Sequence, residues 1–263
     1  MELRLERLAS EAHRLLHKGQ ASRQSGLLSQ LLDFPGAVRR NRAWVLIALG
    51  LFYGTTLVGG LLAWFDQVYA EAILGPQQVL LMEDMYGEAA VRSVEANLTM
   101  TGFYVFNNVG IAFRCFATGF LLGIGPIFYM VFNGLNLGAV AGHLVRIGAG
   151  GNIGAFVVSH APWELTAIGL AGAAGLQMGW AVIAPGRHTR LGRLRRVGPE
   201  LMRQVLGIAA FLLVAALIEG LWSATSAPAW VKLSCGIVGA VLVGWILIFS
   251  GRRRPLPEDV RDG

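Results

Sequence analysis

The chain has 263 residues, a net charge of +6 and a mean hydropathy of +0.55, with 54% hydrophobic and only 14% charged residues. About a quarter of the residues in a soluble domain are charged, so this composition excludes an ordinary soluble domain and favours an integral membrane protein. Nucleic acid is a poor explanation for the positive charge, because the basic residues stand at the ends of apolar segments, as they do in membrane proteins.

The first apolar segment, residues 43–65, is long enough to cross a hydrocarbon layer of about 30 Å. Three arginines precede it, and an acidic stretch, 66–102, follows it. The positive-inside rule therefore predicts a cytoplasmic N-terminus and places 66–102 outside, where apolar residues at helical spacing predict a surface helix. The arm, 1–42, begins with a predicted basic amphipathic helix that lies on the inner membrane surface or against the membrane domain.

Arginines in 187–203 and at 252–254 mark two further cytoplasmic segments, including a tail at 251–263. Apolar segments at 162–184, 201–222 and 230–250 supply three crossings between these markers. The intervening stretch, 103–150, must then cross twice, with a break near Gly123 and Pro126 or near Asn133 and Gly134, or fold back as a re-entrant hairpin. This predicts an all-α, polytopic membrane protein, with a membrane domain at 43–250, about six transmembrane segments and both termini in the cytoplasm.

Small residues recur every four positions in three of these segments, a spacing that lets helix backbones approach closely in lipid. They are Gly119 and Gly123; Gly134, Gly138 and Gly142; and Ala171, Gly175 and Gly179. The spacing predicts tight packing within one bundle, and self-association into a homo-oligomer is the alternative.

Polar residues in the apolar segments gather toward the predicted outer side. Such residues are costly in a membrane, so they are candidates for function. The predicted polar cluster, which binds a ligand or stabilises the fold, contains Asn107, Asn108, Arg114, Asn133, His160, Glu164 and Glu219. His143 and Arg146 fall near the same side.

Glu164 has a simpler explanation, which is stabilisation of a helix N-terminus together with an ion pair to Arg114 or Arg146. His160 and Glu164 are four residues apart and could bind a metal, but Pro162 makes a continuous helix there doubtful and no third ligand stands at a telling spacing. We therefore predict no metal and no other cofactor. No catalytic spacing is apparent, and we predict no enzymatic activity.

Ordered motifs over most of residues 30–225 resemble the stage II sporulation protein M family of bacterial membrane proteins. The motifs lie at 34–40, 102–108 (GFYVFNN), 133–144 (NGLNLGAVAGHL), 160–165, 171–176 (AGAAGL), 180–187 and 218–220 (IEG). The chain resembles a stand-alone, non-sporulation-type member with a short N-terminus. It departs from the family pattern at Ser159 to Pro162, where the family has Pro-His-Gly before the glutamate, and at Pro228, which follows the IEG motif later than usual.

The resemblance implies a location in the bacterial inner (plasma) membrane and no enzymatic activity. In spore formers the namesake anchors an engulfment complex with peptidoglycan-degrading partners, sporulation proteins D and P. The outward polar cluster and the absence of catalytic spacing lead us to expect a non-enzymatic scaffold that contacts membrane lipid. We expect it to recruit cell-envelope proteins, such as a peptidoglycan-remodelling complex, through that cluster and the arm, with no nucleic-acid partner. A permease or lipid-handling protein is the alternative and predicts a cavity reaching Arg114 and Glu164. A metal-dependent membrane hydrolase is the third, and requires His160 and Glu164 within coordination distance of one ion.

Overall fold

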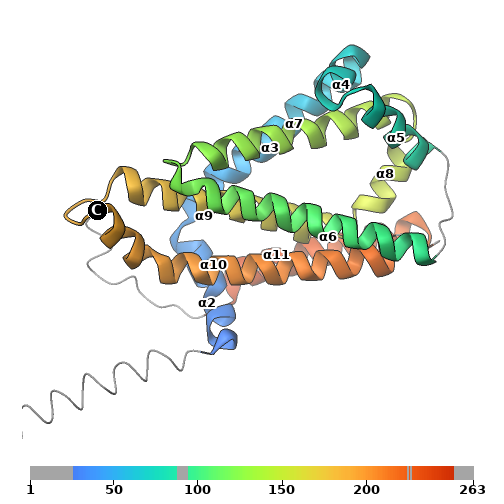
Figure 1. Ribbon diagram of the computed structural model, residues 1–263. Helices are drawn as coiled ribbons and strands as arrows, with labels where there is room; N and C mark the ends of the chain where they lie inside the picture. Colours follow the sequence, from blue (N-terminus) through green and yellow to red (C-terminus); the bar gives the residue numbers. More distant parts are fainter. Residues whose placement is uncertain (1–25, 88–93, 224, 226, 252–263) are drawn as a thin grey trace, which may run out of the picture.

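The structure is a computed structural model that describes residues 26–87, 94–223, 225 and 227–251, with only the backbone described at 87 and 94–105. Every regular element in this part of the chain is a helix, which confirms the predicted all-α class (Figure 1). The helices are α2 (Leu27–Arg40), α3 (Arg42–Phe65), α4 (Gln67–Leu74), α5 (Pro76–Gly87), α6 (Val94–Ala117), the 3-10 turn η1 (Thr118–Phe120), α7 (Ile124–Arg146), α8 (Gly150–Val157), α9 (Ala161–Ile183), α10 (Arg190–Ile218), the π-helix η2 (Glu219–Ser223) and α11 (Ala229–Phe249).

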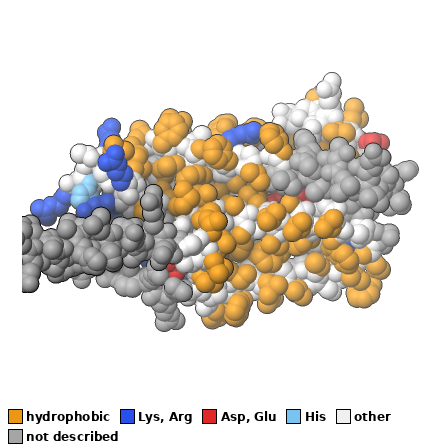
Figure 2. Space-filling model, turned by 60° about the horizontal axis from the view of Figure 1, so that its bottom comes forward, with side chains coloured by type: hydrophobic (Ala, Val, Ile, Leu, Met, Phe, Trp, Pro, Cys, Tyr) orange, Lys and Arg blue, Asp and Glu red, His pale blue; other side chains and the backbone are white. Residues whose placement is uncertain are grey.

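Five of these helices are long and apolar enough to cross a membrane: α3, α7, α9, α10 with η2, and α11. A sixth long helix, α6, has 24 residues and packs against α7 and α9. Large apolar side chains such as Leu46, Leu213 and Val241 are exposed on the sides of the bundle. In Figure 2 hydrophobic side chains cover the visible side, while Lys and Arg gather mainly at one end. This distribution suits a helical bundle surrounded by lipid.

The stretch 103–150 forms two long antiparallel helices joined by a tight turn. The turn occupies 118–123, where Leu122 and Gly123 adopt left-handed backbone with φ of 55° and 77°. The break therefore falls at the first of the two predicted places, whereas Asn133 lies inside α7. With 24 and 23 residues, α6 and α7 are each about 35 Å long. Their length favours two crossings over a re-entrant hairpin.

Glycine contacts join the helices in the predicted way. A side chain at Gly138 would collide with the carbonyl oxygen of Thr56, and one at Gly142 with that of Gly60. On the other side of the bundle, Gly119 lies against the backbone of Gly175. The four-residue spacing thus brings α7 against α3, and the α6–α7 turn against α9, within one bundle.

The two ends of the bundle differ in charge and in the helices that form them. The α6–α7 turn, the start of α3 and the loop between α9 and α10 lie at one end, which we call the basic end because 39–42 and 187–196 carry its arginines. The helices α4, α5 and α8 lie at the opposite, distal end (Figure 1). The helix α9 runs through the centre and packs against α3, α6, α7, α10 and α11.

The predicted flanking helices have mixed outcomes. The amphipathic helix expected at the chain start lies outside the described residues. The rest of the arm forms α2, whose Phe34 packs edge to face on Phe211 of α10 at 5.4 Å. The acidic stretch contains a short helix, α5, where a surface helix was predicted, and a further one, α4, that was not predicted. Gly75, with a left-handed φ of 83°, and Pro76 separate the two.

Candidate functional site

The start of α9 brings His160 and Glu164 together. The Glu164 amide N–H donates to the His160 carbonyl at 3.1 Å, so the first helical turn already begins at His160. Pro162 stands in that first turn, where a missing N–H costs nothing. The imidazole Nε2 of His160 then lies 3.8 Å from Oε2 of Glu164.

A third side chain reaches the same place from α10. Glu219 begins η2, the π-helix at the distal end of α10, and its Oε1 lies 3.9 Å from Nε2 of His160. One ligand atom from each of His160, Glu164 and Glu219 lies within 4.8 Å of the other two. The residues are nearly buried: His160 is 4% exposed and Glu219 5%. We call this trio the acid–histidine cluster. Spacing along the chain did not mark Glu219 as a third candidate ligand, because Glu219 reaches the cluster from a different helix.

Hydrogen bonds behind the cluster fix the imidazole. Nδ1 of His160 lies 3.0 Å from Oγ of Ser223. Nζ of Lys232 donates to the Ser223 carbonyl at 2.8 Å, and the Ser159 hydroxyl donates to the Lys232 carbonyl at 3.1 Å. Sequence reasoning missed these three residues, although Lys232 stands out as a base inside an apolar segment, and that signal could have found it.

A cavity of about 480 Å³ lies beside the cluster, between α3, α4, α5, α6, α7 and α9. Its polar lining residues are Gln78, Asn107, Asn108, Asn133, Asn136 and Glu164. We call it the amide cavity. Four of the predicted site residues therefore share one cavity, and Gln78 and Asn136 are additions that the sequence did not single out.

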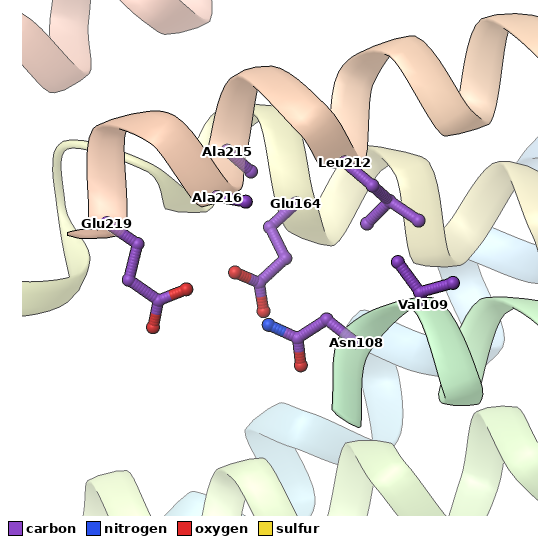
Figure 3. A pocket seen from close by; sticks show the side chains of 7 residues that line it. All are labelled: Asn108, Val109, Glu164, Leu212, Ala215, Ala216 and Glu219. Atoms are coloured by element: carbon purple, nitrogen blue, oxygen red, sulfur yellow. The ribbon is translucent and has the colours of Figure 1, made fainter. Parts of the chain in front are cut away.

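Glu164 and Asn108 connect the amide cavity to the cluster. Together with Glu219 and the apolar residues Val109, Leu212, Ala215 and Ala216 they line a second, much smaller pocket. Figure 3 shows the side chains of Asn108 and Glu164 pointing toward each other, with the Glu219 carboxylate on the same side. The predicted convergence of Asn108, Glu164 and Glu219 is thus present in the structure.

Arg114 does not join these residues. It is exposed one turn before the end of α6, near the basic end, and lines neither pocket. Arg146 donates to Gln67, and His143 pairs with Glu83 at 2.7 Å. Within the described part of the chain no ion pair joins Glu164 to either arginine, and its buried Oε2 has no hydrogen-bond partner. An ion pair with arginine therefore does not explain Glu164.

A family model described as Stage II sporulation protein M matches residues 44–224. The chain belongs to this family. The match runs from α3 through η2 and so includes the amide cavity and all of the acid–histidine cluster. No curated protein and no solved structure shows a significant match to this chain. Family membership and the five apolar helices together identify a membrane protein.

Proposed function

We propose that the amide cavity binds a small polar solute or a polar lipid headgroup, and that the protein acts as a permease or a lipid-handling protein. The supporting observation is the cavity itself, whose volume of about 480 Å³ lies in the usual range for ligand sites. It brings six polar side chains from four helices into a bundle whose sides expose many large apolar side chains. Polar groups are costly at such positions and mark substrate pathways in membrane proteins.

The lining favours a ligand that donates hydrogen bonds. The side-chain amides of Asn133 and Asn136 donate to the carbonyls of Tyr129 and Phe132 in their own helix, both at 2.7 Å. Each leaves its Oδ1 as an acceptor, and Glu164 adds a carboxylate. No lysine or arginine is among the lining residues. An amine or a polyol therefore suits this cavity better than an anion.

A separate observation favours a lipid as the ligand of the amide cavity. An open apolar groove of about 550 Å³ lies on the other side of Leu165, between the start of α9 and the middle of α11. Leu165 lines both the groove and the amide cavity, so an acyl chain in the groove would lie next to a headgroup in the amide cavity.

Thermal unfolding in detergent tests the proposal with ethanolamine, glucose, glycerol 3-phosphate and a short-chain phosphatidylethanolamine. We expect a compound bearing an amine or hydroxyls to raise the melting temperature of the wild type, because a ligand that binds only the folded state stabilises it. The double variant Asn133→Leu/Asn136→Leu should lose this shift, while Ser234→Leu on the outer face of α11 should keep it. Equal shifts in both variants, or no shift in the wild type, would contradict the proposal.

Scaffolding is the second candidate, supported by a different observation. The short helices α4 and α5 expose Val68, Leu80 and Leu81, although neither helix is a candidate membrane span. An apolar face of this kind can dock a cell-envelope protein. A photocrosslinker at Leu80 should then capture an envelope protein, and one at Leu191, exposed near the basic end, should not. Capture of lipid alone at Leu80 would count against a scaffold.

A further inference from the structure

We infer that His160, Glu164 and Glu219 form a binding site for one divalent transition-metal ion, with Zn²⁺ the best fit. The inference is independent of ligand binding in the amide cavity, although Glu164 belongs to both sites. Each of the three residues offers a metal-binding atom, and these atoms lie within 4.8 Å of one another.

The distances in the cluster are those of groups that face a shared centre. Nε2 of His160 lies 3.8 Å from Glu164 and 3.9 Å from Glu219, too far for a hydrogen bond to either carboxylate. Two ligand atoms bound to a tetrahedral zinc ion are about 3.4 Å apart. A contraction of a few tenths of an ångström would bring the imidazole nitrogen to this spacing from each carboxylate, while the two carboxylate oxygens, within 4.8 Å of each other, would have to approach by up to about 1.4 Å.

The only ion-pair partner that the described residues offer these carboxylates is the His160 imidazole, at 3.8 and 3.9 Å. Oε2 of Glu164 is buried without a hydrogen-bond partner. Glu219 is 5% exposed and receives no hydrogen bond from the described residues. The nearby buried base, Lys232, directs its Nζ to the Ser223 carbonyl. Because burial of an unpaired carboxylate is very costly, a cation between the two carboxylates supplies what the described side chains do not.

The imidazole is oriented as a metal ligand would be. Metal-binding histidines usually donate their second ring N–H to a fixed acceptor, which determines the tautomer. The Ser223 hydroxyl, 3.0 Å from Nδ1, accepts such a hydrogen bond in the tautomer that carries the proton on Nδ1. With the proton on Nδ1, the lone pair of Nε2 faces both carboxylates.

The π-helix at the end of α10 places two residues around the imidazole of His160. Glu219 and Ser223 are the first and last residues of the π-helix, and they contact opposite nitrogens of one imidazole. Single π-helical turns occur frequently at functional sites. The ion would therefore join the start of α9 to the end of α10.

The donor set selects the metal. One imidazole and two carboxylates suit Zn²⁺, and Mn²⁺ is the next candidate, whereas Ca²⁺ and Mg²⁺ prefer oxygen ligands alone. Three protein ligands leave a fourth zinc position for water or for the second oxygen of a glutamate.

The test is calorimetric titration of the full chain in mild detergent with Zn²⁺ and with Mn²⁺, using a purification tag that contains no histidine. We expect one ion per chain, and at least a tenfold weaker affinity in Glu219→Gln and in Glu164→Gln. These substitutions preserve shape, and size-exclusion chromatography and thermal unfolding without metal report whether the variants fold. A variant that does not fold is replaced by Glu219→Asp, which keeps the charge, shortens the reach and should also bind more weakly.

Glu83→Gln is the matched control. Glu83 pairs with His143 at 2.7 Å, so it also removes a carboxylate beside a buried histidine, but His143 and Glu83 are not part of a three-ligand group in the described residues. Its metal affinity should stay within twofold of the wild type. A wild type that binds neither ion, or glutamine variants at 164 and 219 that bind as the wild type does, would overturn the inference.

Discussion

Buried polar residues in this bundle fall into two groups at the residue scale. Gln177 and Gln204 satisfy one another with two reciprocal hydrogen bonds of 3.0 and 2.9 Å. Lys232 is satisfied by a backbone carbonyl. Glu164 and Glu219, in contrast, receive no hydrogen bond from the described residues. On the proposals made above, the second group is the one whose partner is a ligand or an ion.

The glutamine pair gives a prediction about stability. Gln204→Leu leaves the buried Gln177 amide without its partner, and we expect the free energy of unfolding to fall by about 1–3 kcal/mol. Replacing both glutamines by leucine should recover most of this loss, because no unsatisfied amide remains. Denaturant unfolding in detergent of Gln204→Leu, Gln177→Leu and the double variant measures the energetic coupling between the two glutamines. A double variant as unstable as the sum of the single variants would contradict it.

At the scale of elements, α3 and α7 pack through direct backbone contacts. Gly142 meets the backbone of Gly60, and Gly138 meets that of Thr56. The two helices therefore run parallel at a backbone-to-backbone distance that only residues without a Cβ allow.

Gly142→Val tests this contact. The added side chain would collide with the Gly60 carbonyl, and we expect the free energy of unfolding to fall by about 1–3 kcal/mol through overpacking. Gly54→Val is the control, because it adds the same side chain to α3 at a position with open space around it. Thermal unfolding of both variants makes the comparison, and similar melting temperatures would show that the contact does not matter.

Sequence predicted some elements well and others poorly for physical reasons. The predicted crossings at 43–65 and 162–184 match α3 and α9 within a residue or two, because hydrocarbon thickness imposes the length of an apolar helix. The short helix α4 was not predicted, although Gly75 and Pro76 mark where it ends. The proximity of His160 and Glu219 depends on how α9 packs on α10, and no spacing along the chain contains that information.

Arg114 shows a further limit of sequence reasoning about the site. It was grouped with the polar cluster because it is a charge inside an apolar stretch. The turn at 118–123 places it near the basic end, where an arginine side chain can reach the membrane surface. The depth of a polar residue therefore depended on where the hairpin turned.

At the scale of the whole molecule, arginines gather at one end and polar lining residues lie toward the other. The cavity residues of α4 and α5 belong to the distal end, and the acid–histidine cluster lies at the start of α9 and the end of α10. The positive-inside rule predicts that the basic end faces the cytoplasm. We therefore propose that the amide cavity opens to the outer side of the membrane.

Cysteine accessibility in intact cells tests this central claim most directly. In a background with Cys115→Ala and Cys235→Ala, Asn133→Cys probes the cavity, Val241→Cys probes the lipid-facing side of α11, and Ile124→Cys probes the α6–α7 turn. A membrane-impermeant maleimide should label position 133 from outside, label 124 only after the cells are opened, and leave 241 unlabelled. Absence of labelling at 133, or labelling there only after the cells are opened, would contradict an outward-facing polar cavity.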